Sequence, residues 1–176
     1  FVCASIKSMN QKPKVGLYVD GANLFYQGRR NGWMIDYKKL LVWVRKESDI
    51  VVAKYFIGKP SWEPAKSLNQ TFNSYLEKIG YSIITKPLKK IKTKGGEIKN
   101  KCNFDVEMHD EIIHDLSKLD IVYLVSGDSD FMRTKQRVLS NQKKIKFLAY
   151  KRGCSWEIRM SWHVLLDDIK AEVERT

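Results

Sequence analysis

The chain has 176 residues, of which 43% are hydrophobic and 30% are charged, and 32 Lys and Arg against 20 Asp and Glu give it a net charge of +12. This length and composition are typical of one globular domain and exclude an intrinsically disordered chain. The positive charge favours a polyanionic partner, with nucleic acid as the first candidate and a membrane surface as the second, although many basic proteins bind neither.

The cysteines and the first residues of the chain indicate the cellular compartment to expect. Cys3, Cys102 and Cys154 are widely spaced and form no C-x-x-C pair, so they predict no disulfide framework, and we expect a reducing, cytoplasmic compartment. No apolar run is long enough to cross a membrane, and residues 1–13 lack the apolar core of a signal peptide. We therefore predict a single domain over residues 14–170, an N-terminal extension over residues 1–13, and no membrane partner.

The first predicted elements are a strand and a helix. Residues 15–20 form a short apolar run closed by an acid, which predicts a strand. Residues 36–48 then place apolar side chains at the i, i+3, i+4 and i+7 positions of an amphipathic helix, with Asp36 as its N-cap. The apolar side chains of this helix are Tyr37, Leu40, Leu41 and Val44.

Further strands and helices alternate along the rest of the chain. Residues 49–58, 81–88, 120–128 and 143–151 predict four more strands, and residues 65–79, 103–116 and 130–141 predict helices between them. The face of the 65–79 helix is expected to consist of Leu68, Phe72, Tyr75, Leu76 and Ile79, with Gly80 ending the helix. Residues 155–169 predict a closing helix, or a helix and a strand. This alternation favours βαβ units and a mostly parallel sheet.

Charge is distributed in blocks. Residues 38–101 hold 15 Lys or Arg against 5 Asp or Glu, residues 102–130 hold 1 against 8, and residues 131–159 hold 9 against 1. The most basic stretch, residues 89–101, surrounds Gly95-Gly96 and predicts a hairpin or a loop. An acidic segment thus lies between two basic ones.

One acid of the 103–116 helix falls on its apolar face. At about 100° per residue, Asp105 projects into the middle of the face formed by Val106, Met108, His109, Ile112, Ile113 and Leu116. Glu107, His114 and Asp115 project elsewhere and are expected to be solvated. Two explanations for Asp105 stay open: the favourable positive end of the helix, or a location beside other acids and a cation. For His109 a hydrogen bond in the core is favoured over metal ligation.

Other acids are available at the ends of strands. Ligands of parallel sheets bind beyond the carboxyl ends of the strands, where Asp20 ends the first predicted strand and Asp128 ends the fourth. If these strands are neighbours, they lie about 4.8 Å apart. Carboxylates that converge in this way repel one another unless a cation joins them, and their hard oxygen ligands favour Mg²⁺ or Mn²⁺. Such ions can bind a phosphodiester and assist its hydrolysis.

Three motifs together carry a resemblance to a known family. "YVDGANLFY", "FDVEM" and "SGDSDF", in this order and spacing, resemble the NYN domains of the PIN-like nuclease superfamily, closest to the LabA-like group, over about residues 14–170. The resemblance implies a three-layer α/β/α sandwich around a mostly parallel five-stranded sheet, for which we expect the order 3-2-1-4-5. It also implies a ribonuclease that depends on Mg²⁺ or Mn²⁺.

The resemblance also implies the site residues. Asp20, Asp105, Asp128 and Asp130 would hold metal, with Asp130 adding a ligand or orienting the attacking water, and Asn23 would position the scissile phosphate or a water. Ser126 is expected either to support a ligand from behind or to face the phosphate. Many members carry another Asp six residues after the counterpart of Asp105. Here that position is Glu111, which projects off the apolar face, and Asp110 precedes it, so either residue is a candidate for the additional ligand.

RNA is the expected partner, and basic residues near the motifs are the expected contacts. These are Arg29, Arg30, Lys89, Lys90, Lys92, Lys94, Arg133 and Lys135. Tyr26 is either a platform for an unpaired base or part of the core. A second hypothesis keeps the fold and the basic surface but no catalysis, so that the protein is an RNA-binding or regulatory module. The sequence leaves open whether two copies form a homodimer.

Overall fold

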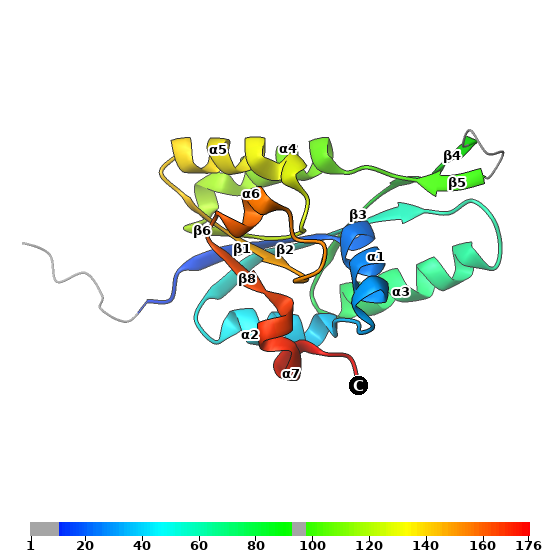
Figure 1. Cartoon of the computed structure of the whole chain (residues 1–176), viewed down its shortest axis with the longest axis horizontal. Helices are drawn as coiled ribbons and strands as arrows, with labels where there is room; N and C mark the ends of the chain where they lie inside the picture. Colours follow the sequence, from blue (N-terminus) through cyan, green and yellow to red (C-terminus); the bar gives the residue numbers. More distant parts are fainter. Residues whose placement is uncertain (1–10, 93–97) are drawn as a thin grey trace, which may run out of the picture.

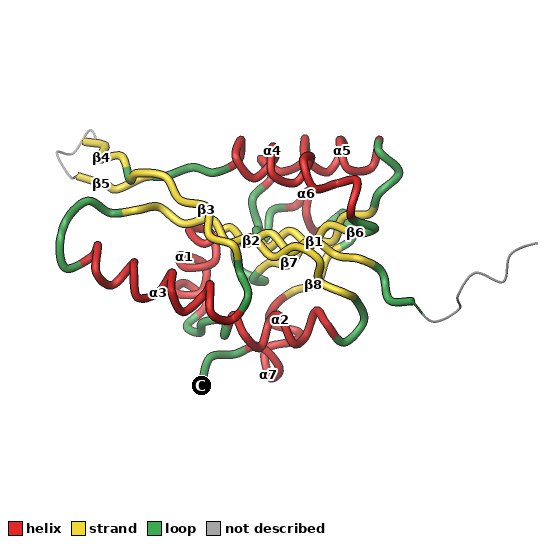
Figure 2. Tube along the Cα trace, turned by 180° about the vertical axis from the view of Figure 1, so that it is seen from behind, coloured by secondary structure: helices red, strands yellow, loops and turns green. Residues whose placement is uncertain are grey.

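A parallel six-stranded sheet in the order β3-β2-β1-β6-β7-β8 organises the chain. The structure, a computed structural model, describes residues 11–92 and 98–176, with the side chains of residues 90–92 and 98–101 outside that description. Helices cover both faces of the sheet (Figure 1), and the same three layers are seen from behind in Figure 2. The α/β class and the layered architecture are therefore confirmed.

The six strands are β1 Lys14–Asp20, β2 Asp49–Lys59, β3 Ser82–Pro87, β6 Ile121–Val125, β7 Lys144–Ala149 and β8 His163–Leu165. The helices are α1 Gly21–Asn31, α2 Tyr37–Arg45, α3 Ala65–Ile79, α4 Asp105–Asp115, α5 Met132–Ser140, α6 Trp156–Arg159 and α7 Lys170–Val173. Short 3₁₀ turns are η1 Leu116–Lys118, η2 Ser129–Phe131 and η3 Leu166–Ile169.

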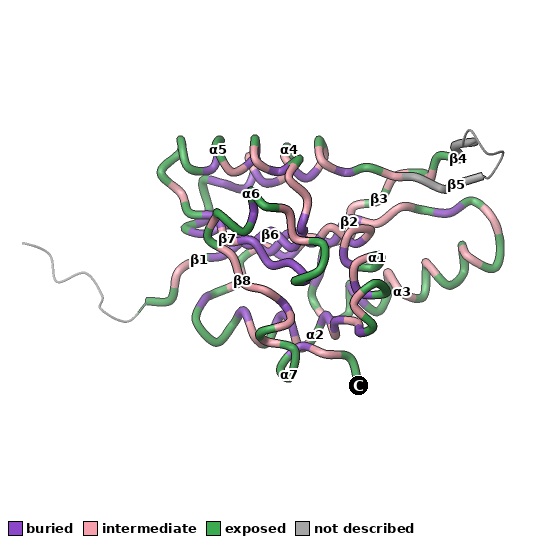
Figure 3. Tube along the Cα trace, in the orientation of Figure 1, coloured by how far each residue is buried: buried purple, intermediate pink, exposed green. Residues whose placement is uncertain are grey.

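Two apolar clusters hold the layers together. One joins the sheet to α1, α2, α3 and α7, and the other joins it to α4, α5 and α6. Buried positions concentrate in the central strands, whereas the outer faces of the helices are exposed (Figure 3). β6 is buried along its whole length because helices cover it on both sides.

The predicted strand order is confirmed for the first five strands, but the prediction of five strands is wrong. β8 adds a sixth strand, which pairs with β7 through Phe147↔His163, Leu148↔Val164 and Ala149↔Leu165. β8 has only three residues, too few to show the alternating pattern of a strand. It is recognised as a strand by its pairing with β7.

The basic segment forms an antiparallel hairpin of β4 Lys89–Lys92 and β5 Ile98–Lys101. It extends away from the body of the molecule (Figures 1 and 2). The predicted turn at Gly95-Gly96, together with Lys94, lies outside the described residues, as do the first ten residues of the predicted N-terminal extension. Within the described part of the chain, none of the helices has the length and apolarity that a membrane span requires.

Local signals placed two helices correctly. The Asp36 carboxylate accepts hydrogen bonds from the backbone N–H groups of Lys38 (2.8 Å) and Lys39 (3.0 Å), as an N-cap does. α3 ends at Gly80, whose φ of +112° lies in the left-handed region that glycine adopts without strain. The apolar face of α3 is only partly covered, however. Leu68 and Tyr75 are 67% and 41% exposed, because neither packs against the sheet as the core residue Leu76 does.

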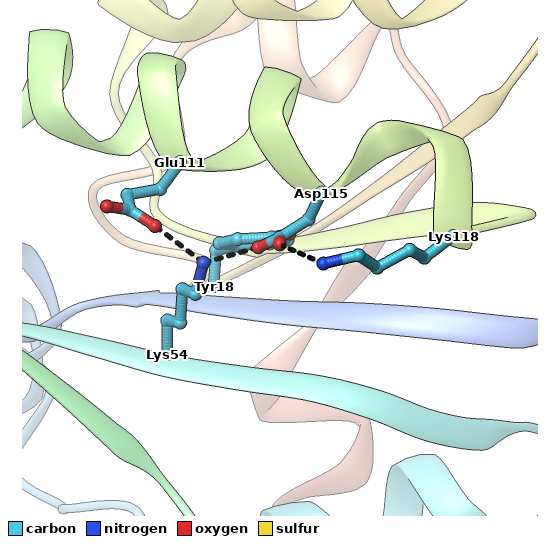
Figure 4. A network of polar contacts seen from close by, with 5 residues as sticks. All are labelled: Tyr18, Lys54, Glu111, Asp115 and Lys118. Atoms are coloured by element: carbon cyan, nitrogen blue, oxygen red, sulfur yellow. Dashed lines mark hydrogen bonds and ion pairs between the residues drawn. The ribbon is translucent and has the colours of Figure 1, made fainter.

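On α4 two predicted positions are wrong. Val106 is 70% exposed instead of lying in the core. Asp115, expected to be solvated, is 3% exposed because it joins a polar network under the helix (Figure 4). Tyr18 Oη donates to Asp115 Oδ2 at 3.1 Å, and Lys54 pairs with both Asp115 and Glu111. Burial acts to raise the pKa of Asp115, but Lys54, Tyr18 and Lys118 outweigh it and lower that pKa below its usual value.

Candidate active site

The carboxyl ends of β1 and β6 meet at one edge of the sheet. The two strands are parallel neighbours, with Val19 paired with Val125, so the residues that follow them start from adjacent positions. Asp20 closes β1. Asp128 lies three residues beyond the end of β6. The prediction that the two strands are parallel neighbours is confirmed, and so is the prediction that Asp20 ends its strand. The prediction that Asp128 ends its strand is wrong, because β6 ends at Val125 and Asp128 lies in the loop that follows.

Asp20 is held by two hydrogen bonds. Its Oδ1 accepts from the backbone N–H of Asn23 at 3.0 Å, as the N-cap of α1, and its Oδ2 accepts from Ser126 Oγ at 3.2 Å. Both bonds favour the charged carboxylate. Burial nevertheless raises the pKa of Asp20 to about 6, with further increases from the negative charges of Asp105 and Asp128. These hydrogen bonds therefore hold the Asp20 carboxyl in place, but no described lysine or arginine pairs with its charge.

The loop after β6 is fixed to the start of α1. Ser126 is fully buried, and its Oγ also accepts from Asp128 N at 3.3 Å. Gly127 N donates to Asn23 Oδ1 at 3.2 Å. A Cβ on Gly127 would lie 2.4 Å from the Gly153 carbonyl oxygen, so only glycine fits here. Asn23 thus clamps the loop through its carbonyl oxygen, and Ser126 supports Asp20 from behind rather than facing solvent.

Asp105 and Asp130 approach each other from two separate segments. Asp105 begins α4, and Asn103 Nδ2 donates to its Oδ2 at 2.6 Å, whereas the cap position of the helix is Phe104. Burial raises the pKa of Asp105, and the nearby negative charges of Asp130 and Asp128 raise it further, whereas the hydrogen bond from Asn103 acts to lower it. Asp105 therefore lies beside two other acids as well as at the positive end of its helix. Capping alone therefore does not account for Asp105.

The acids lack a cationic partner within the described part of the protein. No ion pair there joins a lysine or arginine to Asp20, Asp105, Asp128 or Asp130. Nor, among these residues, is any group of three Asp, Glu, His or Cys side chains arranged to hold a metal ion. The donors, all carboxylate oxygens, suit a hard divalent cation, but they are not gathered into a ready-made ligand cage.

Comparison with known proteins places this arrangement in a family. The NYN domain family model matches residues 14–165. The chain belongs to the NYN domain family. Over 169 residues it is 26% identical to the Low amplitude and bright protein LabA of Synechococcus elongatus, an alignment that covers 93% of this chain and 89% of that protein. Its fold is also similar to the crystal structure of VPA0982, a protein of unknown function from Vibrio parahaemolyticus, with a TM-score of 0.77, 25% identity, and coverage of 96% of this chain and 99% of that one.

The candidates for an additional acidic ligand lie elsewhere on this NYN domain. Glu111 pairs with Lys54 at 2.5 Å as part of the network in Figure 4, and Asp110 is exposed on α4. Six residues of helix carry Glu111 about 9 Å along the α4 axis from Asp105. The structure does not bring either residue together with the four aspartates.

The predicted RNA contacts of the NYN domain lie on several elements. Arg29 and Arg30 are exposed on α1, where the Arg29 guanidinium lies 5.8 Å from the ring centre of Phe25, and Tyr26 is 59% exposed rather than part of the core. Lys89 is exposed on β4. Lys135 instead donates to Ser161 Oγ at 2.7 Å, so it faces away from Arg133 on α5. The positions of the Lys90, Lys92 and Lys94 side chains lie outside the described part.

A groove of about 590 Å³ runs between α4 and α5. Its lining residues are Asp105, Val106, His109, Asp130, Arg133, Thr134, Gln136, Arg137 and Ser140. The predicted hydrogen bond of His109 is confirmed, since its Nδ1 lies 3.0 Å from Thr134 Oγ1 and links the two helices, but the ring is half-buried and lines the groove instead of lying in the core. Arg137 was not among the residues predicted from the sequence. Its spacing of four residues from Arg133, which puts both on one helix face, was the available signal.

Proposed function

We propose that this NYN domain is a divalent-metal-dependent ribonuclease that hydrolyses RNA phosphodiester bonds at the acid cluster. One observation carries the proposal: Asp20, Asp105, Asp128 and Asp130, from three separate segments, lie close enough for their charges to raise the pKa values of Asp20 and Asp105, with no lysine or arginine paired to them in the described residues. Charges arranged at such a cost to stability are typical of functional sites.

Asp20, Asp105 and Asp128 would hold the ion, and Asp130 would add an oxygen or orient the attacking water. When bound, Mg²⁺ or Mn²⁺ supplies positive charge for the phosphodiester and for the negative charge that develops during hydrolysis. The chain's own residues prepare this site. Ser126 fixes the orientation of Asp20, and Asn23 fixes the loop that carries Asp128, so neither acid has to be ordered when substrate binds.

Asp130 is expected to act differently from Asp20. Both oxygens of Asp20 accept hydrogen bonds, from Asn23 N and Ser126 Oγ, so this carboxylate is held in one orientation. The charge of Asp130 raises the pKa of Asp105, and a divalent cation bound at the cluster would offset this repulsion. Asp130 would then add an oxygen to the ion or orient the attacking water.

Cleavage of labelled RNA tests the proposal. Wild-type protein should degrade the RNA with Mn²⁺ and not with chelator, and Asp128→Asn should reduce the rate by roughly 10²-fold or more, because metal charge stabilisation supplies several kcal/mol. Asp168→Asn, an exposed acid on η3, is the matched control and should cleave as wild type does. Equal cleavage by wild type and Asp128→Asn would show that the activity lies elsewhere or in a contaminant.

A non-catalytic RNA-binding module is the second candidate, favoured by the finding that the described acids form no ready-made metal cage. Both candidates expect basic residues to hold RNA. Replacing Lys89, Lys90, Lys92 and Lys94 with Ala should weaken binding to all sequences. It should also flatten the salt dependence by roughly 0.7 units of slope for each single-strand phosphate that is no longer neutralised. RNA binding that responds to these changes, without any metal-dependent cleavage, would favour the module.

A further inference from the structure

We propose that the groove between α4 and α5 holds a nucleotide of single-stranded RNA beside the bond that the acid cluster cleaves. This inference rests on the proposed function and adds to it a position for the strand. The groove and the acid cluster are continuous, because Asp105 and Asp130 line the groove and also belong to the cluster. A strand whose phosphate lies at the cluster can therefore continue directly between the two helices.

Two arginines give the groove its charge. Arg133 and Arg137 are both exposed, both line the groove, and lie about 6 Å apart along α5, since four residues rise 1.5 Å each. Guanidinium groups bind phosphate oxygens in a bidentate manner. Lys135, between them in sequence, points to Ser161 instead, so the positive charge of this part of α5 is concentrated on the groove side.

None of the described acids of α4 beyond Asp105 lines the groove, although Asp110 is exposed on the same helix. Glu107 pairs with Lys86 at 2.5 Å, and Glu111 pairs with Lys54 at 2.5 Å. The acids that line the groove, Asp105 and Asp130, both lie at the end of the groove that adjoins the acid cluster. The groove therefore changes from acidic to basic along its length, which suits a phosphate chain that meets a cation at one end and arginines at the other.

The wall on the α4 side suits a base. Val106 is 70% exposed, an unusual position for valine on a helix that packs on a core, and it lines the groove beside the His109 ring. Thr134, which is 2% exposed, fixes that ring through its hydrogen bond to Nδ1. A held imidazole and an exposed apolar side chain can contact the face of an unpaired base, whereas the bases of a duplex are stacked inside it. The volume of about 590 Å³ is also within the usual range for ligand sites.

The test measures binding of a fluorescein-labelled single-stranded RNA of mixed sequence, in chelator and at several salt concentrations. Arg133→Gln/Arg137→Gln should reduce the salt slope by about 1.4, because two phosphates of a single strand are no longer neutralised. The control, Lys38→Gln/Lys78→Gln, removes the same charge from exposed positions on α2 and α3, in the opposite layer, and should keep the wild-type slope. Val106→Ser should weaken binding by about fourfold, as expected when roughly one methyl group is no longer buried, without changing the slope.

The outcomes separate this inference from the proposed function. If wild type cleaves and Asp128→Asn does not, but the arginine variant binds with the wild-type slope, the groove assignment is overturned and the ribonuclease stands. If the slope falls only in the arginine variant and no metal-dependent cleavage occurs, the groove stands and the ribonuclease is overturned. Equal slopes in the arginine variant and the lysine control, or a slope that falls equally for a duplex of the same strand, also overturn the groove assignment.

Discussion

The two ends of helix α4 hold acids in opposite electrostatic settings. At its second half, Glu111 and Asp115 pair with Lys54, and the pKa of Asp115 is lowered. At its first residue, burial raises the pKa of Asp105, and the negative charges of Asp130 and Asp128, rather than a lysine, add to that increase. Asp115 and Asp105 are both at least partly withdrawn from water, so burial alone does not explain the difference. The sign of the nearest charge does.

The comparison separates acids that stabilise the fold from acids available for function. Asp115 has its counterion inside the chain, so a metal would have to displace Lys54 to bind there. Asp20 and Asp105 have none among the described residues, so a proton or a cation from solution would stabilise them. The two regions should therefore respond in opposite directions when a charge is removed.

The largest effect is expected at the paired end. Lys54→Met leaves Asp115 buried without its main counterion, which typically costs about 3 to 5 kcal/mol. Denaturant unfolding should show this decrease in stability. Lys118→Met removes a lysine that is 61% exposed at 3.5 Å from the same carboxylate, and should cost less than about 1 kcal/mol. An unfolding free energy of Lys54→Met within about 0.5 kcal/mol of wild type would refute the structural role of this network.

At the unpaired end, removing charge should stabilise the metal-free protein. The pKa of Asp20 is about 6 in the folded state against 3.8 ordinarily. The native state thus binds more protons between these values, and stability falls as pH rises through that window. Asp20→Asn should remove this fall and add about 1 to 3 kcal/mol at neutral pH. Chemical denaturation in chelator across the acidic range measures it. A wild-type stability that rises over the same window would contradict the raised pKa.

The sequence predicted elements whose signals are local. Asp36 and Gly80 mark helix ends because a cap and a left-handed turn depend on neighbouring residues only. The strand order and the adjacency of Asp20 and Asp128 followed from βαβ alternation and the family motifs. The edge strand β8 matches the helix-and-strand alternative for residues 155–169, but its three residues are too few for the sequence to choose it over a single closing helix.

Features that depend on distant partners were not predictable. Asp115 was assigned to solvent because a helical projection does not include Lys54 on β2 or Tyr18 on β1, which bury it. Val106 and Leu68 were predicted on buried helix faces but are exposed. The periodicity of a helix does not show how far the sheet beneath it extends. The clamp between Asn23 and Gly127 likewise joins segments 104 positions apart in sequence.

A smaller effect is expected behind the site. Ser126→Ala removes the hydroxyl that donates to Asp20 and accepts from Asp128 N, which should cost about 1 kcal/mol in stability. Because that bond favours the charged carboxylate, its removal should raise the pKa of Asp20 further and shift the acidic fall in stability to higher pH. Ser129→Ala, at a half-buried turn position, is the control. An unchanged pH profile in Ser126→Ala would contradict the supporting role of Ser126.

The central claim is that the unpaired acids bind a divalent cation. A calorimetric titration with Mn²⁺, at neutral pH and in the absence of RNA, tests it most directly. Wild type should bind Mn²⁺ and gain stability from it, since a ligand that binds only the folded state stabilises that state. Asp128→Asn should abolish this binding, and the exposed control Asp168→Asn should keep it. No binding to the wild type at millimolar Mn²⁺, or equal binding to Asp128→Asn, would contradict the account.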